Sequence, residues 1–351
     1  MPLAEILGQD RAVAFLRSAW RTGRLSQAYC FAGPAGVGKR TAALALAQAI
    51  NCLAAGNAAS QATADACGRC AACRKIAAGN HPDVIEVRPE EKTVITIDQI
   101  REVAARASLR AYEGRAKVWI LDPADQMQEP AANAFLKTLE EPAGVSLFIL
   151  VTATPSALLP TILSRCQEVR FDLLGEGHLR DLLARHGRPP EAAALAGGSA
   201  ARALALDVAE ARARRDRIVQ EVWDALGSLP AVLERADDLG SDRPAFEAAL
   251  EILAGYTRDM IVAKIAGGAV PLVHGDREAD VARLAARYPV GAILNVFEAQ
   301  VEAQRALARR ANPRFTAERM LLRMRDAVGR GQPACVPRTG REGSHGPHGS
   351  G

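Results

Sequence analysis

The residues with the clearest potential for chemistry form a glycine-rich stretch, FAGPAGVGKRTAALALA, at residues 31–47. Gly33, Gly36 and Gly38 let backbone N–H groups converge on phosphate oxygens, and Lys39 adds a positive charge at the start of the following helical pattern. The order of strand, loop and helix is the one that a phosphate-binding loop requires. The stretch therefore predicts a nucleotide-phosphate site; a glycine-rich turn without a ligand is the alternative.

The loop departs from the usual pattern at Arg40, where phosphate-binding loops carry the Ser or Thr hydroxyl that ligates Mg²⁺. A guanidinium there brings positive charge towards the place of the metal. Thr41 offers the nearest hydroxyl and is a candidate nucleotide-binding residue. However, one step along a helix turns a side chain by about 100°, so this hydroxyl is expected to point away from the metal.

A second departure follows the predicted strand KVWIL at residues 117–121. Nucleotide hydrolases end such a strand in Asp-Glu, in which the Asp holds the metal through water and the Glu positions the attacking water. Here Asp122 is followed by Pro123, which cannot polarise water. Asp122 stays a candidate nucleotide-site residue, but the departures at Arg40 and Pro123 together predict a lost ATPase activity.

Four cysteines form another group with metal-binding potential: Cys52, Cys67, Cys70 and Cys73. Two Cys-x₂-Cys steps that share Cys70 place three thiolates on one tight knuckle, and the upstream cysteine completes a tetrahedral set. A disulfide is disfavoured because we expect a cytosolic protein. The pattern predicts a structural Zn²⁺ site.

The elements that must position these residues follow from the hydrophobic pattern. From about residue 28 to 172, short apolar runs such as AYCFA at 28 and SLFILVT at 146 alternate with helix-like segments, which indicates a parallel sheet covered by helices. Ala, Leu, Arg and Glu at helical spacing then continue to about residue 328. We expect an α/β fold followed by an all-α part, and a disordered tail at 331–351.

Composition limits the classes of protein. The chain has 351 residues, of which 49% are hydrophobic, so it is long enough for two or three domains with their own cores. Its net charge of +4 falls short of the basic excess of a chain that works mainly through phosphate contacts. The start resembles no leader peptide, and no apolar run reaches the roughly 20 residues that span a bilayer. We therefore expect a cytoplasmic protein without a membrane partner.

Residues 121–171, LDPADQMQEPAANAFLKTLEEPAGVSLFILVTATPSALLPTILSRCQEVRF, closely resemble the clamp-loader subunits of the AAA+ superfamily, and among them the delta prime family of bacterial DNA polymerase III. Unrelated phosphate-loop proteins have no physical reason to share NAFLKTLEEP followed about two dozen residues later by SRC. The resemblance extends over most of the first 172 residues, including ITIDQIREV. Beyond residue 207 it is one of helical pattern and length, with NPRFTAERMLLRM at 312 similar to the final collar helix of the family.

The resemblance implies an AAA+ P-loop domain at 1–172 with a zinc module at about 52–80, a helical lid at 173–207 and a collar domain at 208–330. It also implies a pentameric ring that loads the sliding clamp onto primed DNA at the nucleoid-associated replisome. The direct partners would be gamma/tau and delta type subunits, and the clamp and DNA would be reached through the complex. ATP would be bound weakly or only at a subunit interface.

The same resemblance assigns roles to three further residues. Arg165 would reach into the ATP site of a neighbouring subunit, where an arginine finger raises the rate by about 10³ or more. Thr152 stands at the place of the sensor hydroxyl, and Arg202 at the place of the second sensor, on the lid. An ordinary surface arginine is the alternative for Arg165 and for Arg202.

Two other functions stay open. An active gamma/tau-type ATPase would require turnover by the isolated chain despite Arg40 and Pro123. A zinc-dependent nucleic-acid-binding module would require strong DNA affinity without partner subunits.

Overall fold

The computed structural model describes residues 1–54, 65–90, 94–140 and 146–331. It divides into two compact units, Met1–Val208 and Ala209–Gly351. The division falls beside residue 208, where the collar domain is predicted to begin. The predicted tail, apart from its first residue, lies outside the described residues, as does the segment 55–64 of the predicted zinc module.

The first unit is built on a five-stranded sheet in the order β2-β3-β4-β1-β5, and every neighbouring pair is parallel. The strands are β1 (Ala28–Ala32), β2 (Val84–Val87), β3 (Lys117–Leu121), β4 (Ser146–Thr152) and β5 (Gln167–Arg170). The central strands β1, β3 and β4 are buried along their whole length, which explains their continuous apolar sequences. The predicted α/β class with a parallel sheet is confirmed.

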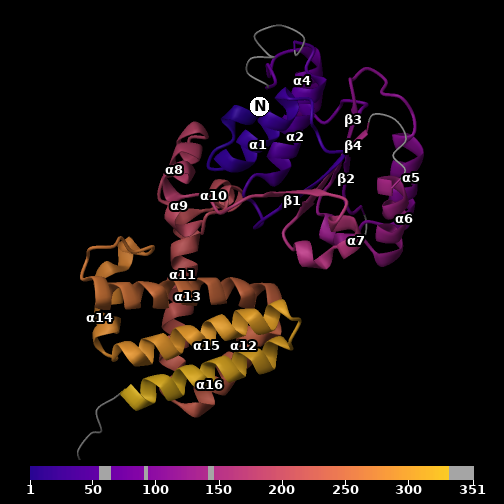
Figure 1. Ribbon diagram of the computed structural model, residues 1–351. Coiled ribbons are helices and arrows are strands. Elements are labelled where there is room, and N and C mark those ends of the chain that lie inside the picture. The colour runs from indigo at the N-terminus through magenta and orange to yellow at the C-terminus, as the bar shows by residue number, and fades with distance from the viewer. Residues whose placement is uncertain (55–64, 91–93, 141–145, 332–351) are drawn as a thin grey trace, which may run out of the picture. The chain divides into compact units, whose positions relative to one another are not determined.

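Helices cover both faces of this sheet (Figure 1). Tyr29 and Phe31 of β1 face a core shared with α1 and α2, whereas Cys30 between them faces the core of α5, α6 and α7. This alternation follows from the two-residue period of a strand. The helices and short 3₁₀ turns of this part are η1 (Leu3–Glu5), α1 (Asp10–Arg21), α2 (Lys39–Asn51), α4 (Ala71–Ala77), α5 (Ile97–Ala107), η2 (Ala124–Gln126), α6 (Glu129–Glu140), η3 (Pro155–Ala157) and α7 (Pro160–Leu163).

A small helical group follows β5 within the first unit. It consists of α8 (Glu176–Arg185), α9 (Ala192–Leu195) and α10 (Ala200–Ala205). Leu179 and Leu183 of α8 are buried in the same core as α1 and α2. The Ser199 hydroxyl caps α10 by accepting a hydrogen bond from the N–H group of Arg202. The N–H group of Ala201 donates to the carbonyl oxygen of Gly36 in the glycine-rich loop, so the beginning of α10 lies beside that loop.

Up to residue 331, where the described part of the chain ends, the regular elements of the second unit are all helices, as predicted. Its elements are α11 (Val208–Ala225), α12 (Leu229–Ser241), α13 (Arg243–Ala266), η4 (Gly275–Arg277), α14 (Glu278–Ala286), α15 (Val290–Ala308) and α16 (Pro313–Gly331). Its main core contains Phe246 and Leu250 of α13 together with Met320 and Met324 of α16. No helix among the described residues is both long and apolar enough to cross a membrane.

A buried carboxylate fastens the segment after α13. Asp259 is fully buried and accepts hydrogen bonds from the N–H groups of Val273 and His274 at 3.1 and 2.8 Å. His274 Nδ1 lies 2.9 Å from the same carboxylate. Burial alone would raise the pKa of Asp259, but its hydrogen bonds with His274 and Val273 outweigh burial and lower it.

Candidate functional site

The glycine-rich loop connects β1 to α2 and passes close to backbone on both sides. Gly33, Gly36 and Gly38 all have positive φ angles, of 151°, 75° and 99°. A Cβ atom at Gly33 would lie 2.1 Å from the carbonyl oxygen of Phe171, and one at Gly36 would lie 2.2 Å from Ser199 Oγ. Glycine is therefore required at these two positions by the close approach of Phe171, the residue after β5, and of the start of α10.

Lys39 is turned back onto its own loop. Its side chain is buried, and Nζ donates to the carbonyl oxygens of Gly33 and Pro34 at 2.6 and 2.5 Å. Burial lowers the pKa of Lys39, and the nearby carboxylates of Asp122 and Asp125 oppose part of that shift. The ammonium group thus satisfies carbonyl oxygens of the loop rather than projecting into open space.

Arg40 pairs with an acidic residue of the neighbouring strand β2. Its Nε and Nη2 atoms donate to Glu86 Oε2 and Oε1 at 2.6 and 2.9 Å, and Arg88 Nη2 adds a contact of 2.5 Å to Oε2. Burial alone would raise the pKa of Glu86, but the two guanidinium groups outweigh burial and lower it. The guanidinium predicted to lie towards the metal is therefore held on Glu86 by a bidentate pair.

The predicted sensor hydroxyl and the acidic residue after β3 lie near this loop. Thr152, fully buried at the end of β4, donates through Oγ1 to Asp125 at 2.7 Å and accepts from the N–H group of Thr154 at 2.9 Å. Burial raises the pKa of Asp122, against the opposing charges of Arg88, Arg40 and Lys39. The hydroxyl of Thr152 is thus committed to contacts within the chain.

A pocket of about 630 Å³ lies over the loop. It is lined by the N-terminal segment, the loop, the ends of β3 and β4 and the small helical group. Thr41, Asp122 and Thr152 belong to the lining, and so do Ala200 and Ala201 of α10. The N–H group of Ala201 donates to the carbonyl oxygen of Gly36 at 3.0 Å, which ties α10 directly to the loop. Arg202, on the same helix, has an exposed side chain.

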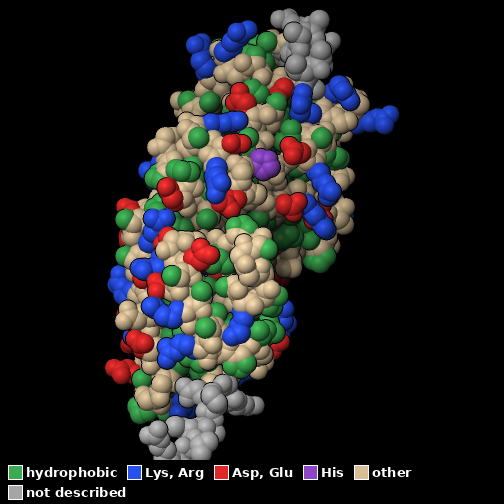
Figure 2. Space-filling view, turned by 90° about the vertical axis from the view of Figure 1, so that its left-hand side faces the viewer, with side chains coloured by type: hydrophobic (Ala, Val, Ile, Leu, Met, Phe, Trp, Pro, Cys, Tyr) green, Lys and Arg blue, Asp and Glu red, His purple; other side chains and the backbone are tan. Residues whose placement is uncertain are grey.

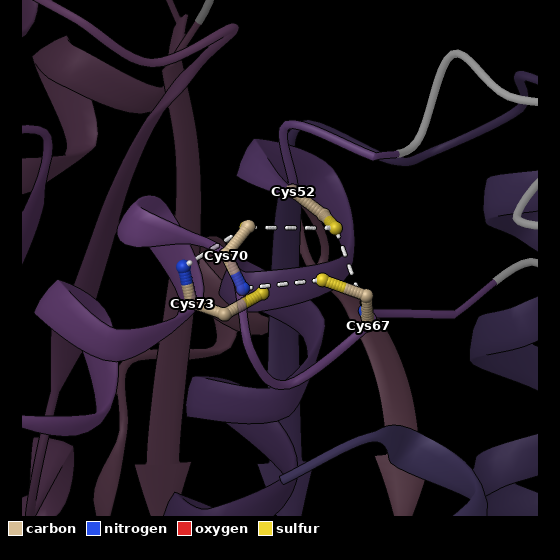
Figure 3. Close-up of side chains that lie close together, drawn as sticks. All are labelled: Cys52, Cys67, Cys70 and Cys73. Carbon is tan, nitrogen blue, oxygen red and sulfur yellow. Dashed lines mark hydrogen bonds between the residues drawn. The ribbon is translucent and has the colours of Figure 1, made fainter.

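Figure 3 shows the four predicted cysteine ligands converging on one small space at the end of α2 and the start of α4. The four sulfur atoms of Cys52, Cys67, Cys70 and Cys73 all lie within 4.8 Å of one another, and those of Cys52 and Cys70 are 3.9 Å apart. A tetrahedral zinc with Zn–S bonds of about 2.3 Å requires sulfur separations of about 3.8 Å. The arrangement therefore fits zinc without rearrangement of the knuckle.

Backbone N–H groups stabilise the negative charge that such ligands carry. Those of Cys67, Cys70 and Cys73 point at the sulfur atoms of Cys52, Cys67 and Cys70 at 3.4, 3.4 and 3.5 Å. Burial alone would raise the pKa of Cys70, but the N–H groups of Cys73 and Leu53 outweigh burial, and the pKa falls to about 6. Burial raises the pKa of Cys52 and Cys73. The donor set fits a cation that holds all four cysteines as thiolates.

Arg165 lies between α7 and β5, on the surface of the first unit. Its side chain is 37% exposed; Nη1 donates to the carbonyl oxygen of Thr161 at 2.9 Å and Nη2 to Glu140 Oε1 at 2.6 Å. Glu140 is the last residue of α6. The guanidinium is therefore oriented by two contacts and remains open to solvent.

Sequence reasoning missed Glu86, Ser199 and Gln9. Gln9 is buried; its side chain donates to the carbonyl oxygens of Val37 and Asp172 at 3.3 and 2.7 Å. Only Glu86 could have been noticed in the sequence, because it is a charged residue in the apolar strand VIEV. Arg88 follows it by two residues, so the two side chains are expected on the same side of the strand.

A parallel sheet with a glycine-rich loop between β1 and α2 is the arrangement of P-loop proteins. The family model described as DNA polymerase III, delta subunit, matches residues 8–174. DNA polymerase III subunit delta' of Pseudomonas aeruginosa is 40% identical over 204 residues, which are 56% of this chain and 60% of that one. The same subunit of Bacillus subtilis is 29% identical over 326 residues, 91% of this chain and 96% of that one.

The chain is thus similar to DNA polymerase III subunits, most of all over its first 174 residues. Subunit tau/gamma of Haemophilus influenzae is also similar, with 34% identity over 55% of this chain and 27% of that one. Among solved structures, a gamma subunit-related protein of Thermotoga maritima covers 89% of this chain and 99% of its own length at 16% identity and a TM-score of 0.37. That structural likeness is too weak to add to the argument. The matched region spans less than two thirds of the Pseudomonas relative.

Proposed function

We propose that this chain acts as a delta prime-type clamp-loader subunit that hydrolyses no ATP itself and completes the ATP site of a neighbouring subunit. One observation supports catalytic silence above all others. The guanidinium of Arg40, which stands in place of a Mg²⁺-ligating hydroxyl, is paired with Glu86 through two hydrogen bonds. Pro123 stands where a water-positioning carboxylate would be needed.

The direct test is ATP turnover by the purified chain, with Lys39→Ala as the matched control for contaminating activity. We expect equal rates in the two proteins. A clear turnover that Lys39→Ala abolishes would contradict catalytic silence and favour the active gamma/tau-type reading. Weak nucleotide binding is compatible with the proposal, because the N–H groups of the loop do not depend on the side chain at position 40.

The role in a neighbouring site rests on Arg165. An exposed guanidinium oriented by Glu140 and Thr161 is able to approach a phosphoryl group on another chain after exchanging its carboxylate partner. There it would stabilise the charge that develops on the transferring group. The proposed partners are gamma/tau and delta type subunits, with the clamp and primed DNA reached through the assembled complex.

A reconstituted complex tests this role. Arg165→Ala is expected to leave assembly intact but to lower DNA- and clamp-stimulated ATPase in part and clamp loading more strongly. The matched control is Arg170→Ala, because Arg170 is an exposed arginine of β5 with its own partner, Glu168. Unchanged rates in the Arg165→Ala complex, or equal losses in both variants, would show that Arg165 has no special role.

A nucleic-acid-binding module is less well supported. On the face in Figure 2, basic and acidic side chains are interspersed. Strong DNA affinity needs a concentrated basic surface, because phosphate contacts supply most of it. The net charge of the whole chain is only +4, so we expect that the isolated chain binds primed DNA weakly.

A further inference from the structure

The N-terminal strap, residues 2–9, lies between the cysteine cluster and the P-loop pocket and contacts both. In Figure 1 the N-terminus lies beside α2 and α4, the two helices that carry cysteines of the cluster or end next to one. The strap contains η1 and continues into α1. Its two ends are held by different buried polar side chains.

At the cysteine end the strap is held by Asp65. This side chain is 5% exposed and lies two residues before Cys67. Its carboxylate oxygens accept hydrogen bonds from the N–H groups of Leu3 and Ala4 at 2.7 and 2.9 Å, and Oδ1 also accepts from Ala66 at 2.7 Å. One carboxylate therefore caps η1 and at the same time fixes the backbone that leads into the knuckle.

Two more contacts join this part of the chain to the knuckle. A Cβ atom on Gly68 would lie 3.7 Å from the ring of Pro2, so the two backbones are close neighbours. Gln48, buried on α2, donates to the carbonyl oxygen of Cys73 at 2.9 Å. The knuckle is thus packed against the strap and is tied to the helix that begins at the P-loop.

At the other end the strap forms part of the pocket. Ile6 and Leu7 line the pocket over the glycine-rich loop. Gln9 follows and joins three segments, because it donates to Val37 in the loop and to Asp172 after β5 and accepts from the N–H group of Asp172 at 3.1 Å. A shift of the strap would therefore move a wall of the pocket and loosen the loop.

We infer that the strap makes the P-loop pocket depend on metal occupancy of the cysteine cluster. A metal that holds the four thiolates fixes the short backbone path from Asp65 to Cys67, and with it the cap on η1. Metal binding supplies much of the folding free energy of small cysteine knuckles, so removing the metal would release Asp65 and then the strap. This inference rests on the proposed zinc site but not on the proposed clamp-loader role.

The experiment compares full-length protein loaded with zinc and stripped by a chelator, using hydrogen exchange of peptides from residues 1–9 and 33–41. Stripping is expected to speed exchange at the amides of Leu3 and Ala4 by about tenfold or more, the effect of losing a charge-assisted hydrogen bond. Exchange in the glycine-rich loop is expected to rise as well. Rapid exchange in the knuckle with an unchanged strap would overturn the inference.

Two variants separate the ends of the strap. Asp65→Asn, measured at saturating zinc, is expected to free the strap while one zinc stays bound. Because coupling is reciprocal, it should also weaken zinc affinity by about tenfold. The matched control is Asp181→Asn, an exposed aspartate of α8 in the same unit, which should change neither quantity. Equal zinc affinity and equal strap exchange in the two variants would contradict the coupling.

Gln9→Ala removes the hydrogen bonds that join the strap to Val37 and Asp172 at the pocket. In this variant zinc removal should still free residues 3 and 4 but should no longer alter exchange in residues 33–41. A loop response as large as in the wild type would overturn the route through Gln9. A chain that binds no zinc would overturn both the coupling and the zinc site. If zinc binds but its removal leaves hydrogen exchange in the strap unchanged, only the coupling is overturned.

Discussion

Replacing Glu86 by glutamine is expected to destabilise the first unit by about 1–2 kcal/mol. Three charge-assisted hydrogen bonds converge on this carboxylate, from Arg40 and Arg88, and the Glu86 side chain is only 19% exposed. A sheltered bond of this kind contributes about 1.5 kcal/mol or more. However, both arginine side chains are nearly half exposed, at 45% and 46%, so solvent screening reduces the contribution to ~1 kcal/mol or less for each pair.

The assay is urea unfolding followed by tryptophan fluorescence, with the midpoint shift converted through the slope of the transition. The matched control is Glu168→Gln, because Glu168 pairs with the far more exposed Arg170. The free energy of unfolding of the Glu168→Gln variant should differ from that of the wild type by no more than about 0.5 kcal/mol. A Glu86→Gln variant that loses no more stability than this control would refute the reasoning.

Acid pH offers a second check on the same residue. The two guanidinium groups overcome the effect of burial and lower the pKa of Glu86 in the folded chain. A carboxylate with a lowered folded pKa contributes stability that is present above its unfolded pKa and is lost as the pH falls through the folded pKa. The difference in stability between wild type and Glu86→Gln should therefore be full at neutral pH and shrink in acid. A difference that grows on acidification would contradict the assignment.

Three further outcomes are expected. Metal analysis of protein prepared without chelator should find one zinc per chain, and Cys70→Ser should lose it; a metal-free wild type would contradict the site. Gly36→Ala should destabilise the first unit by about 1–3 kcal/mol, measured by urea unfolding, because its Cβ would lie 2.2 Å from Ser199 Oγ. Asp259→Asn should destabilise the second unit by about 1–3 kcal/mol in thermal unfolding, because His274 and two N–H groups lose an ionised acceptor. Because the pKa of Asp259 is lowered in the folded chain, the difference in stability between this variant and the wild type should shrink in acid.

The local order of hydrophobic runs and glycines was sufficient to predict the parallel sheet and its glycine-rich loop. The strand AYCFA, the glycines that follow it and the helix after Lys39 are encoded within some twenty consecutive residues, and the sheet class follows from repeated units of this kind. The cysteine cluster was also predictable, because two of its spacings are short and fixed. The clamp-loader resemblance is confirmed by the family match over residues 8–174.

The partners within the site could not be predicted in the same way. Arg40 and Glu86 are 46 residues apart, and Leu3 and Asp65 are 62 apart; they meet only because helices and strands bring distant segments together. A sequence shows that Arg40 cannot ligate a metal, but it does not show which carboxylate the guanidinium will contact. Thr152 is similar: its place at a strand end is predictable, whereas its hydrogen bond to Asp125 depends on the turn after β3.

The pair formed by Arg40 and Glu86 ties the residue at position 40 to the stability of the first unit. A mutation that restored Thr at position 40 would remove the bidentate partner of Glu86 and lower stability at once. If the chain hydrolyses no ATP, as proposed, this change would supply a hydroxyl for Mg²⁺ but no water-positioning carboxylate, because Pro123 would be unchanged. Placing Glu at position 123 first would add a negative charge beside Asp122 without supplying a hydroxyl for Mg²⁺ at position 40. Under the proposed function, a route to hydrolysis therefore needs changes at both positions, and the change at position 40 carries a cost in stability.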